Sequence, residues 1–156
     1  LVFVNRINLN IVFKKYSKIF QNSVKNVLRK EKKVASGDTL RSILVKTFSN
    51  PNSSGLYLYA NKTFEFIQSG RRPGKNPPYS AILRWVKNKP VSLKFGYNEK
   101  KAASAIMRGI GQKGIEPTNI AEQALSNILP SLIQEASAAY IRDVETAIKK
   151  GKDNVN

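Results

Sequence analysis

The sequence contains no cysteine and no histidine. The absence of cysteine excludes disulfide bonds and thiolate metal sites, and the absence of histidine removes the commonest general base and metal ligand. Catalysis would have to rely on Asp, Glu, Lys, Tyr or Ser. The carboxylates of Asp38, Glu65 and Glu99 do not suggest the acidic cluster that a magnesium-dependent nuclease needs. We therefore expect a protein that is not an enzyme and that uses neither a metal nor a cofactor.

Acidic residues are also scarce. The chain has 10 Asp and Glu against 27 Lys and Arg, which gives a formal net charge of +17. Residues 1–101 carry 21 basic and 4 acidic side chains, whereas residues 102–156 carry six of each. The basic excess therefore belongs to the first two thirds of the chain. A field of this strength favours nucleic acid, an anionic membrane surface or an acidic protein as the partner.

Long apolar runs are absent as well. No stretch of 18 consecutive apolar residues occurs, so we expect no membrane-spanning helix and no membrane partner. The apolar start, residues 1–13, is interrupted by Arg6 and three asparagines and lacks the features of a signal peptide. From the length of 156 residues we expect one domain over residues 1–150, followed by a flexible tail over residues 151–156.

The first half of the chain predicts one helix and two strands. Residues 11–35 have apolar residues at helical spacing, and Gly37 is suited to end this helix. Residues 40–48 are rich in β-branched and aromatic residues, and residues 56–60 alternate aliphatic with aromatic side chains. Because turn-forming residues fill positions 50–55 between them, we expect an antiparallel hairpin.

The remaining pattern is mostly helical. We expect a helix over residues 61–70 that is capped by Asn61 or Thr63 and ended by Gly70. A short helix over 80–89 would have Ser80 as its N-cap and stop at Pro90, a linker would cover 91–100, and an amphipathic helix would cover 100–114. Gly109 and Gly111 each cost that helix about 1 kcal/mol against Ala, which indicates close backbone packing there.

A long helix is predicted to run to about residue 150. It begins with a capping box of Asn119 and Glu122, and Pro130 should bend or split it. The apolar stripe expected to face the core consists of Leu125, Ile128, Leu129, Leu132, Ala136, Tyr140, Val144 and Ile148. The fold class is therefore α+β, with a small antiparallel β-sheet flanked by an N-terminal helix and two longer C-terminal helices.

Two glycine-containing motifs do not support nucleotide binding. The stretch GRRPGK, residues 70–75, has its glycines four apart, and Asn76 follows the lysine where a phosphate-binding loop has Ser or Thr. The stretch GIGQKG, residues 109–114, closes a predicted helix, whereas a dinucleotide-binding motif follows a strand and opens a helix.

Two basic regions are open to two interpretations each. On the first helix, Lys14, Lys15, Lys18, Lys25 and Arg29 form either a solvated face or a DNA-facing surface. A second region mixes cations with aromatic residues in a way that suits nucleic acid, although we favour a core position for Trp85. Its members are Arg71, Arg72, Lys75, Tyr79, Arg84, Trp85, Lys87, Lys89, Lys94, Phe95 and Tyr97.

Three stretches occur in an order that resembles a known family. They are SGDTLRSI (36–43), FEFIQSGRRPGKNPPYSAILRWVKNK (64–89) and AASAIMRGIGQKGIEPTNIAEQAL (102–125). The arrangement resembles the tail-completion, or head–tail joining, proteins of tailed bacteriophages, and in particular virion proteins of crAss-like and other Bacteroidetes phages. The likeness covers roughly residues 9–148, and Gly109 and Gly111 depart from it, because the family usually has larger residues there.

The resemblance implies a non-enzymatic subunit of a neck ring of six or twelve copies that joins portal or adaptor proteins to tail proteins. Packaged DNA would pass through the lumen, and the protein would reside in the virion after assembly in the host cytoplasm. We expect the proline-rich basic loop to dock onto a neighbouring copy or another ring. Its residues are Arg71, Arg72, Pro73, Lys75, Pro77, Pro78 and Tyr79. The expected acidic counterpart lies on the C-terminal helices and consists of Glu122, Glu135, Asp143 and Glu145. The alternative is a basic DNA-binding protein that acts independently of a virion.

Overall fold

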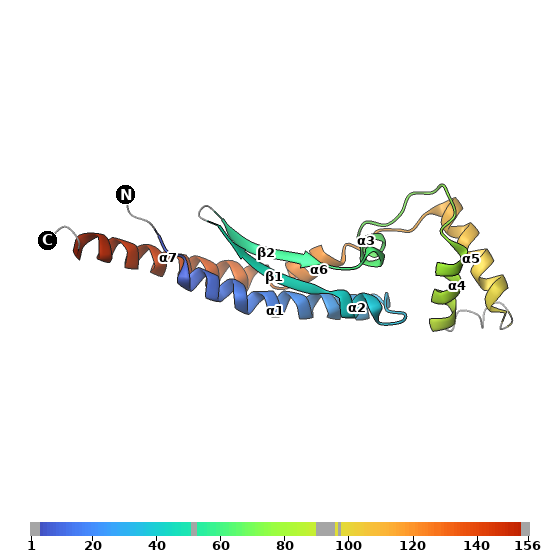
Figure 1. Cartoon of the computed structure of the whole chain (residues 1–156), viewed down its shortest axis with the longest axis horizontal. Coiled ribbons are helices and arrows are strands. Elements are labelled where there is room, and N and C mark those ends of the chain that lie inside the picture. Colours follow the sequence, from blue (N-terminus) through green and yellow to red (C-terminus); the bar gives the residue numbers. More distant parts are fainter. Residues whose placement is uncertain (1–3, 51–52, 90–95, 97, 154–156) are drawn as a thin grey trace. The chain divides into compact units, whose positions relative to one another are not determined.

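The computed structural model describes residues 4–50, 53–89, 96 and 98–153 (Figure 1). Over these residues the chain is α+β, as the sequence predicts, with seven helices and a two-stranded antiparallel sheet. The described positions divide into two compact units. Unit 1 comprises the described residues within 1–26, 43–59 and 122–156, and unit 2 comprises those within 27–42 and 60–121.

Helix α1 spans Ile7–Lys30 and so begins and ends earlier than the predicted range of 11–35. Its C-terminus is closed by two backbone hydrogen bonds, from Lys32 N–H to the carbonyl of Arg29 and from Lys33 N–H to the carbonyl of Leu28, each 3.0 Å long. Lys32 has a positive φ of 53°, so this is a Schellman motif with lysine in the position that usually holds glycine. The prediction that Gly37 ends the helix is therefore wrong.

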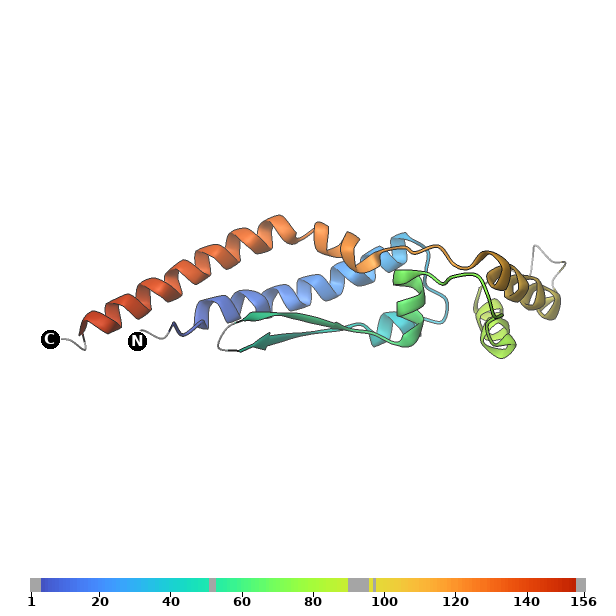
Figure 2. The same ribbon diagram turned by 90° about the horizontal axis from the view of Figure 1, so that it is seen from above.

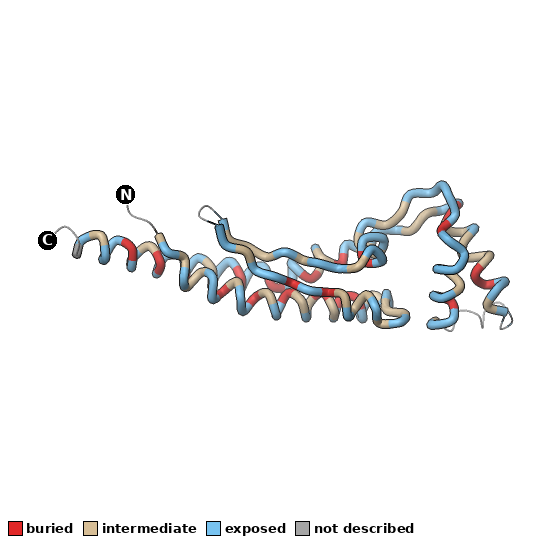
Figure 3. The backbone as a smooth tube through the Cα atoms, in the orientation of Figure 1, coloured by how far each residue is buried: buried red, intermediate tan, exposed pale blue. Residues whose placement is uncertain are grey.

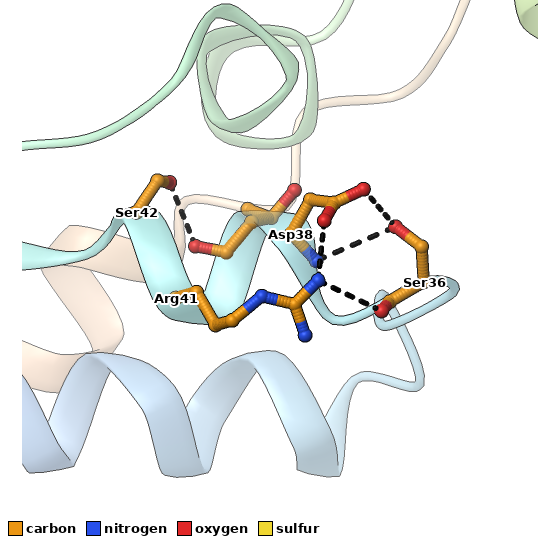
Figure 4. Close-up of polar contacts among 5 residues, drawn as sticks. Ser36, Asp38, Arg41 and Ser42 are labelled. Atoms are coloured by element: carbon orange, nitrogen blue, oxygen red, sulfur yellow. Dashed lines mark hydrogen bonds and ion pairs between the residues drawn. The ribbon is translucent and has the colours of Figure 1, made fainter.

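The hairpin is confirmed. Strands β1 (Leu44–Ser49) and β2 (Ser54–Tyr59) pair from Leu44 opposite Tyr59 to Ser49 opposite Ser54. The predicted first strand starts too early, because residues 38–42 form the short helix α2 (Asp38–Ser42). The Ser36 hydroxyl accepts from the N–H of Asp38 and donates to its carboxylate, and Arg41 pairs with that carboxylate (Figure 4). These local bonds favour a helical turn over a strand.

In unit 1, α1 lies between the hairpin and the segment that contains α6 (Ile120–Ser126) and α7 (Leu129–Asp153) (Figure 2). On the hairpin side, the side-chain oxygen of Gln21 accepts from the N–H of Val45 at 3.1 Å. On the other side, the hydroxyl of Ser23 donates to the carbonyl of Ala124 at 3.0 Å. The break between α6 and α7 precedes Pro130, so the predicted split is confirmed.

Figure 3 shows that buried positions recur along both α1 and α7. The buried apolar residues of α1 are Val12, Tyr16, Phe20, Val24, Val27 and Leu28. The buried positions of α6, α7 and the residues that join them are Ile120, Ala124, Ile128, Leu132, Ala139, Asp143 and Ala147. Leu125, Leu129, Tyr140 and Ile148 are exposed instead, so the predicted stripe is wrong at these four positions.

Unit 2 contains α3 (Lys62–Ser69), α4 (Tyr79–Asn88) and α5 (Glu99–Lys113). The Asn61 side chain caps α3 and Gly70 ends it, both as predicted. Helix α4 begins one residue before Ser80, so Ser80 is not its N-cap. The predicted stop at Pro90 and most of the predicted linker lie outside the described residues.

Helices α4 and α5 pack against each other through a small apolar core. Its buried members are Val86, Ala102 and Ala103, and Ile82, Leu83 and Ile106 pack around them. Helix α5 begins at a side-chain cap, in which the carbonyl oxygen of the Asn98 side chain accepts from the N–H of Lys101 at 2.9 Å. None of the described helices combines the length and the apolar character that crossing a bilayer requires.

Candidate functional site

The basic loop between α3 and α4 is held at Arg71 and Gly74 by the end of α5 and the segment that follows it. Arg71 and Ile115 exchange two backbone hydrogen bonds of 2.8 Å, as an antiparallel bridge does. The N–H of Gly74 donates to the carbonyl of Gly111 in α5 at 2.7 Å. The N–H of Thr118 donates to the carbonyl of Ile67 in α3 at 3.0 Å. The two segments run side by side in both ribbon views (Figures 1 and 2). This pairing gives the loop a fixed shape.

Glycines lie where the two segments touch. Gly70 and Gly114 have φ angles of 71° and 78°, which L-residues rarely adopt. A Cβ on Gly114 would lie 2.2 Å from the carbonyl oxygen of Arg71, and a Cβ on Gly111 would lie 2.0 Å from the side-chain oxygen of Asn76. The expected close packing is therefore confirmed at Gly111. It is wrong at Gly109, where a Cβ would meet no described atom within 4 Å.

The loop cations have different surroundings. The guanidinium of Arg71 donates to the backbone carbonyl of Lys75 and so braces the loop from within. The side chains of Arg72 and Lys75 are exposed, whereas Pro77 is buried. The loop thus presents Arg72 and Lys75 on a backbone that is already ordered.

Trp85 does not occupy the core position that we expected. Its side chain is 39% exposed, while the neighbouring Val86 is only 1% exposed and supplies the apolar contact to α5. Arg84 and Lys87 are exposed beside it. The ammonium of Lys89 donates to the backbone carbonyl of Lys32 at 2.7 Å. Three members of the predicted basic–aromatic mixture, Lys94, Phe95 and Tyr97, lie outside the described residues.

The four predicted acidic residues do not form one exposed surface. Asp143 is 3% exposed, and its carboxylate accepts from the N–H groups of Asn8 and Leu9 and from the side-chain amide of Asn8. Burial raises the pKa of Asp143, but these hydrogen bonds outweigh burial and hold that pKa below its ordinary value. A carboxylate in this position is not available to a cation of another molecule.

Glu135 is also engaged within the chain. Its carboxylate accepts from the ammonium of Lys15 at 2.7 Å and from the hydroxyl of Tyr16 at 3.0 Å. The hydrogen bond from Lys15, followed by that from Tyr16, lowers the pKa of Glu135. Glu122 and Glu145 are the two predicted acidic residues that are exposed.

The cations of α1 also differ in whether they are engaged within the chain. Lys15 points to α7 and pairs with Glu135. Lys14, Lys18 and Arg29 are exposed, and Lys25 is half-buried. Helix α1 contains no acidic residue over its 24 positions, so the only charges on its exposed side are positive, although Ile7, Ile11 and Ile19 are exposed there as well.

The sequence did not reveal the exposed apolar regions of the hairpin and of α7 in unit 1. One contains Leu44, Tyr57 and Tyr59 on the hairpin, and the other contains Ile133 and Ile141 on α7 beside the four mispredicted stripe positions. The alternation of residues 56–60 predicts a strand with two faces but does not tell which face is covered. Within the described part of the chain, no three acidic side chains gather as a metal site would require. No known protein family, curated protein or solved structure matches this chain.

Proposed function

We propose that this chain is a non-enzymatic structural subunit of the neck of a tailed bacteriophage, where it forms part of a ring between the portal and the tail. The sequence resemblance over residues 9–148 suggests this role. The observation that carries it is the basic loop, because its backbone is fixed by the bridge between Arg71 and Ile115 while Arg72 and Lys75 face solvent. The protein would be made in the host cytoplasm and retained in the virion.

A loop of this kind suits docking between rigid protein parts. Three prolines and the backbone pairing with the segment after α5 reduce the conformational entropy that binding would otherwise cost. A guanidinium such as that of Arg72 can bind one carboxylate through two parallel hydrogen bonds. Since Asp143 and Glu135 are engaged within their own chain, we place the loop against an acidic surface of the adjoining portal, adaptor or tail protein.

The test is a charge reversal in the virus that encodes the chain. We expect an Arg72→Glu, Lys75→Glu variant to leave particles as DNA-filled heads without tails, while the variant itself is missing from them. Lys149→Glu, Lys150→Glu is the matched control, because it makes the same charge change on exposed residues of α7. Mass spectrometry and symmetry-resolved imaging of the vertex provide the measurements. Normal tailed particles containing the loop variant, or wild-type particles lacking the chain, would refute the proposal.

A second candidate function, binding to DNA, is favoured by the exposed lysines of α1 and by the absence of acidic residues from that helix. Lys14 and Lys18 are exposed one helical turn apart, and no carboxylate on α1 offsets them. A protein that neutralises phosphates in this way binds duplex with an affinity that falls steeply with salt. We would measure this affinity for the wild type and for Lys14→Ser, Lys18→Ser. Negligible retention on DNA at moderate salt excludes this function.

A further inference from the structure

The outer side of the hairpin is an aromatic surface with one cation. By register, Leu44, Lys46 and Phe48 of β1 lie on the same side as Tyr57 and Tyr59 of β2. The rings of Phe48 and Tyr57 stack with centroids 4.5 Å apart, and the ammonium of Lys46 lies 5.8 Å from the centroid of Tyr59. Tyr57 and Tyr59 are nevertheless each 50% exposed. We call these five residues the hairpin face.

A second apolar surface runs along α7. Leu129, Ile133, Tyr140 and Ile148 recur at intervals of four, seven and eight residues, which places them on one side of the helix. Ile133 is 56% exposed and the other three are exposed by more than a third. Glu145 is exposed one turn after Ile141 and just before Ile148. We call Leu129, Ile133, Tyr140, Ile141, Glu145 and Ile148 the α7 face.

One copy cannot cover its hairpin face with its own α7 face. The opposite side of the hairpin is the one that packs on α1, through Val45 and Gln21. Helix α7 packs on the other side of α1, through Asp143 and Asn8 (Figure 2). The hairpin face therefore points away from α7 of the same chain, and each face needs a partner from outside.

We propose that the hairpin face of one copy packs on the α7 face of the next copy. The charges favour this pairing over either face pairing with itself. Lys46 is the only charged residue between Leu44 and Tyr59, so two hairpin faces would bring like charges together, whereas Lys46 opposite Glu145 joins unlike charges. A contact between two different faces is heterologous and propagates head to tail. Closure of that chain of contacts into a ring rests on the proposed function, but the contact itself does not.

Two face variants of the full-length protein test the contact in solution. The hairpin variant carries Tyr57→Ser and Tyr59→Ser, and the α7 variant carries Ile133→Ser and Tyr140→Ser. Native mass spectrometry should show oligomers for the wild type and a single chain of 17.4 kDa for each variant. Mixing the two variants should restore a species of twice that mass and nothing larger, because each retains one intact face. This restored dimer also shows that both variants are folded.

A charge swap identifies the residues in contact. Lys46→Glu and Glu145→Lys should each weaken assembly, and the double variant should recover it, while Lys18→Glu on exposed α1 should assemble as the wild type does. A monomeric wild type, a mixture that remains monomeric, or a double variant weaker than either single one overturns the contact. These outcomes are read on the isolated protein, so they are distinct from failure of the neck proposal, which is read from virus particles.

Discussion

The carboxylate of Asp143 accepts hydrogen bonds from both the backbone N–H and the side-chain amide of Asn8, at 3.0 and 2.8 Å. It also accepts the N–H of Leu9 at 3.0 Å. The first N–H groups of a helix have no partner within the helix, and α1 has no acidic residue in its own first turn. A residue 135 positions away along the chain therefore caps α1.

Removal of this carboxylate should destabilise unit 1. Asp143→Ala leaves partly buried donors at the start of α1 without their acceptor, so we expect the free energy of unfolding to fall by about 1–3 kcal/mol. The measurement is urea denaturation at neutral pH, followed by the circular dichroism of the helices. Glu116→Ala serves as the control, since Glu116 is exposed, and its effect should stay within about 0.5 kcal/mol. Equal effects of the two substitutions would contradict the capping role.

The same carboxylate predicts a dependence of stability on pH. Because folding lowers the pKa of Asp143, its contribution is complete above the unfolded-state pKa of about 3.9 and is lost as the pH falls through the lower folded-state pKa. The difference in unfolding free energy between the wild type and Asp143→Asn should thus be constant from neutral pH to about pH 5 and shrink below about pH 4. A difference that grows on acidification would refute this assignment.

The cap also explains why the first helix could be predicted only in its middle. Periodicity predicts a helix over residues 11–35, and residues 11–30 of that range are helical. Its start depends on Asp143 and its end on Lys32 in a left-handed conformation. Neither feature can be recognised from the sequence around the helix ends. Asp143 is distant along the chain, and Lys32 is not the glycine that usually occupies a left-handed cap. The caps of α3 were predictable because Asn61 and Gly70 are adjacent to the helix that they bound.

The glycines of the loop provide a prediction with an internal control. Gly114→Ala puts a Cβ against the carbonyl of Arg71 at a φ of 78°, so we expect a loss of about 1–3 kcal/mol in the free energy of unfolding. At Gly109, five residues earlier in α5, an added Cβ meets no described atom within 4 Å. Gly109→Ala should therefore raise the free energy of unfolding by about 0.5–1 kcal/mol. Hydrogen exchange at the N–H groups of Arg71 and Ile115 should accelerate only in Gly114→Ala. Unchanged exchange there would mean that the bridge does not hold the loop.

The candidate site itself was only partly predictable. The composition of residues 70–79 shows that the loop is stiff and basic. Its fixation was not predictable, because the bridge joins Arg71 to Ile115 across 44 residues and involves only backbone atoms. The side chain of Gln68 likewise accepts from the N–H of Ala121, at the start of α6. The predicted capping box at Asn119 is wrong, because Asn119 has a φ of 49° and its N–H donates to the carbonyl of Gln68.

The orientation of α7 was mispredicted for a physical reason. Periodicity selects the stripe with the larger apolar side chains, such as Leu129 and Tyr140. The fold instead buries Ala139, Asp143 and Ala147. The carboxylate of Asp143 must reach the N-terminus of α1, and Ala139 and Ala147 are buried on either side of it along the helix. The stripe with the larger side chains remains exposed.

Trp85 allows the exposure of α4 to be tested by fluorescence, since it is the only tryptophan in the chain. With 39% of its side chain exposed beside Arg84 and Lys87, it should emit at long wavelength and be quenched more strongly by iodide than by caesium at low ionic strength. The Debye length falls from about 30 Å at 0.01 M salt to about 3 Å at 1 M, so the two quenching constants should converge in high salt. Arg84→Ser, Lys87→Ser should lower the ratio of the iodide to the caesium quenching constant without shifting the emission wavelength. Emission at short wavelength, with little quenching by either ion, would instead place Trp85 in the core.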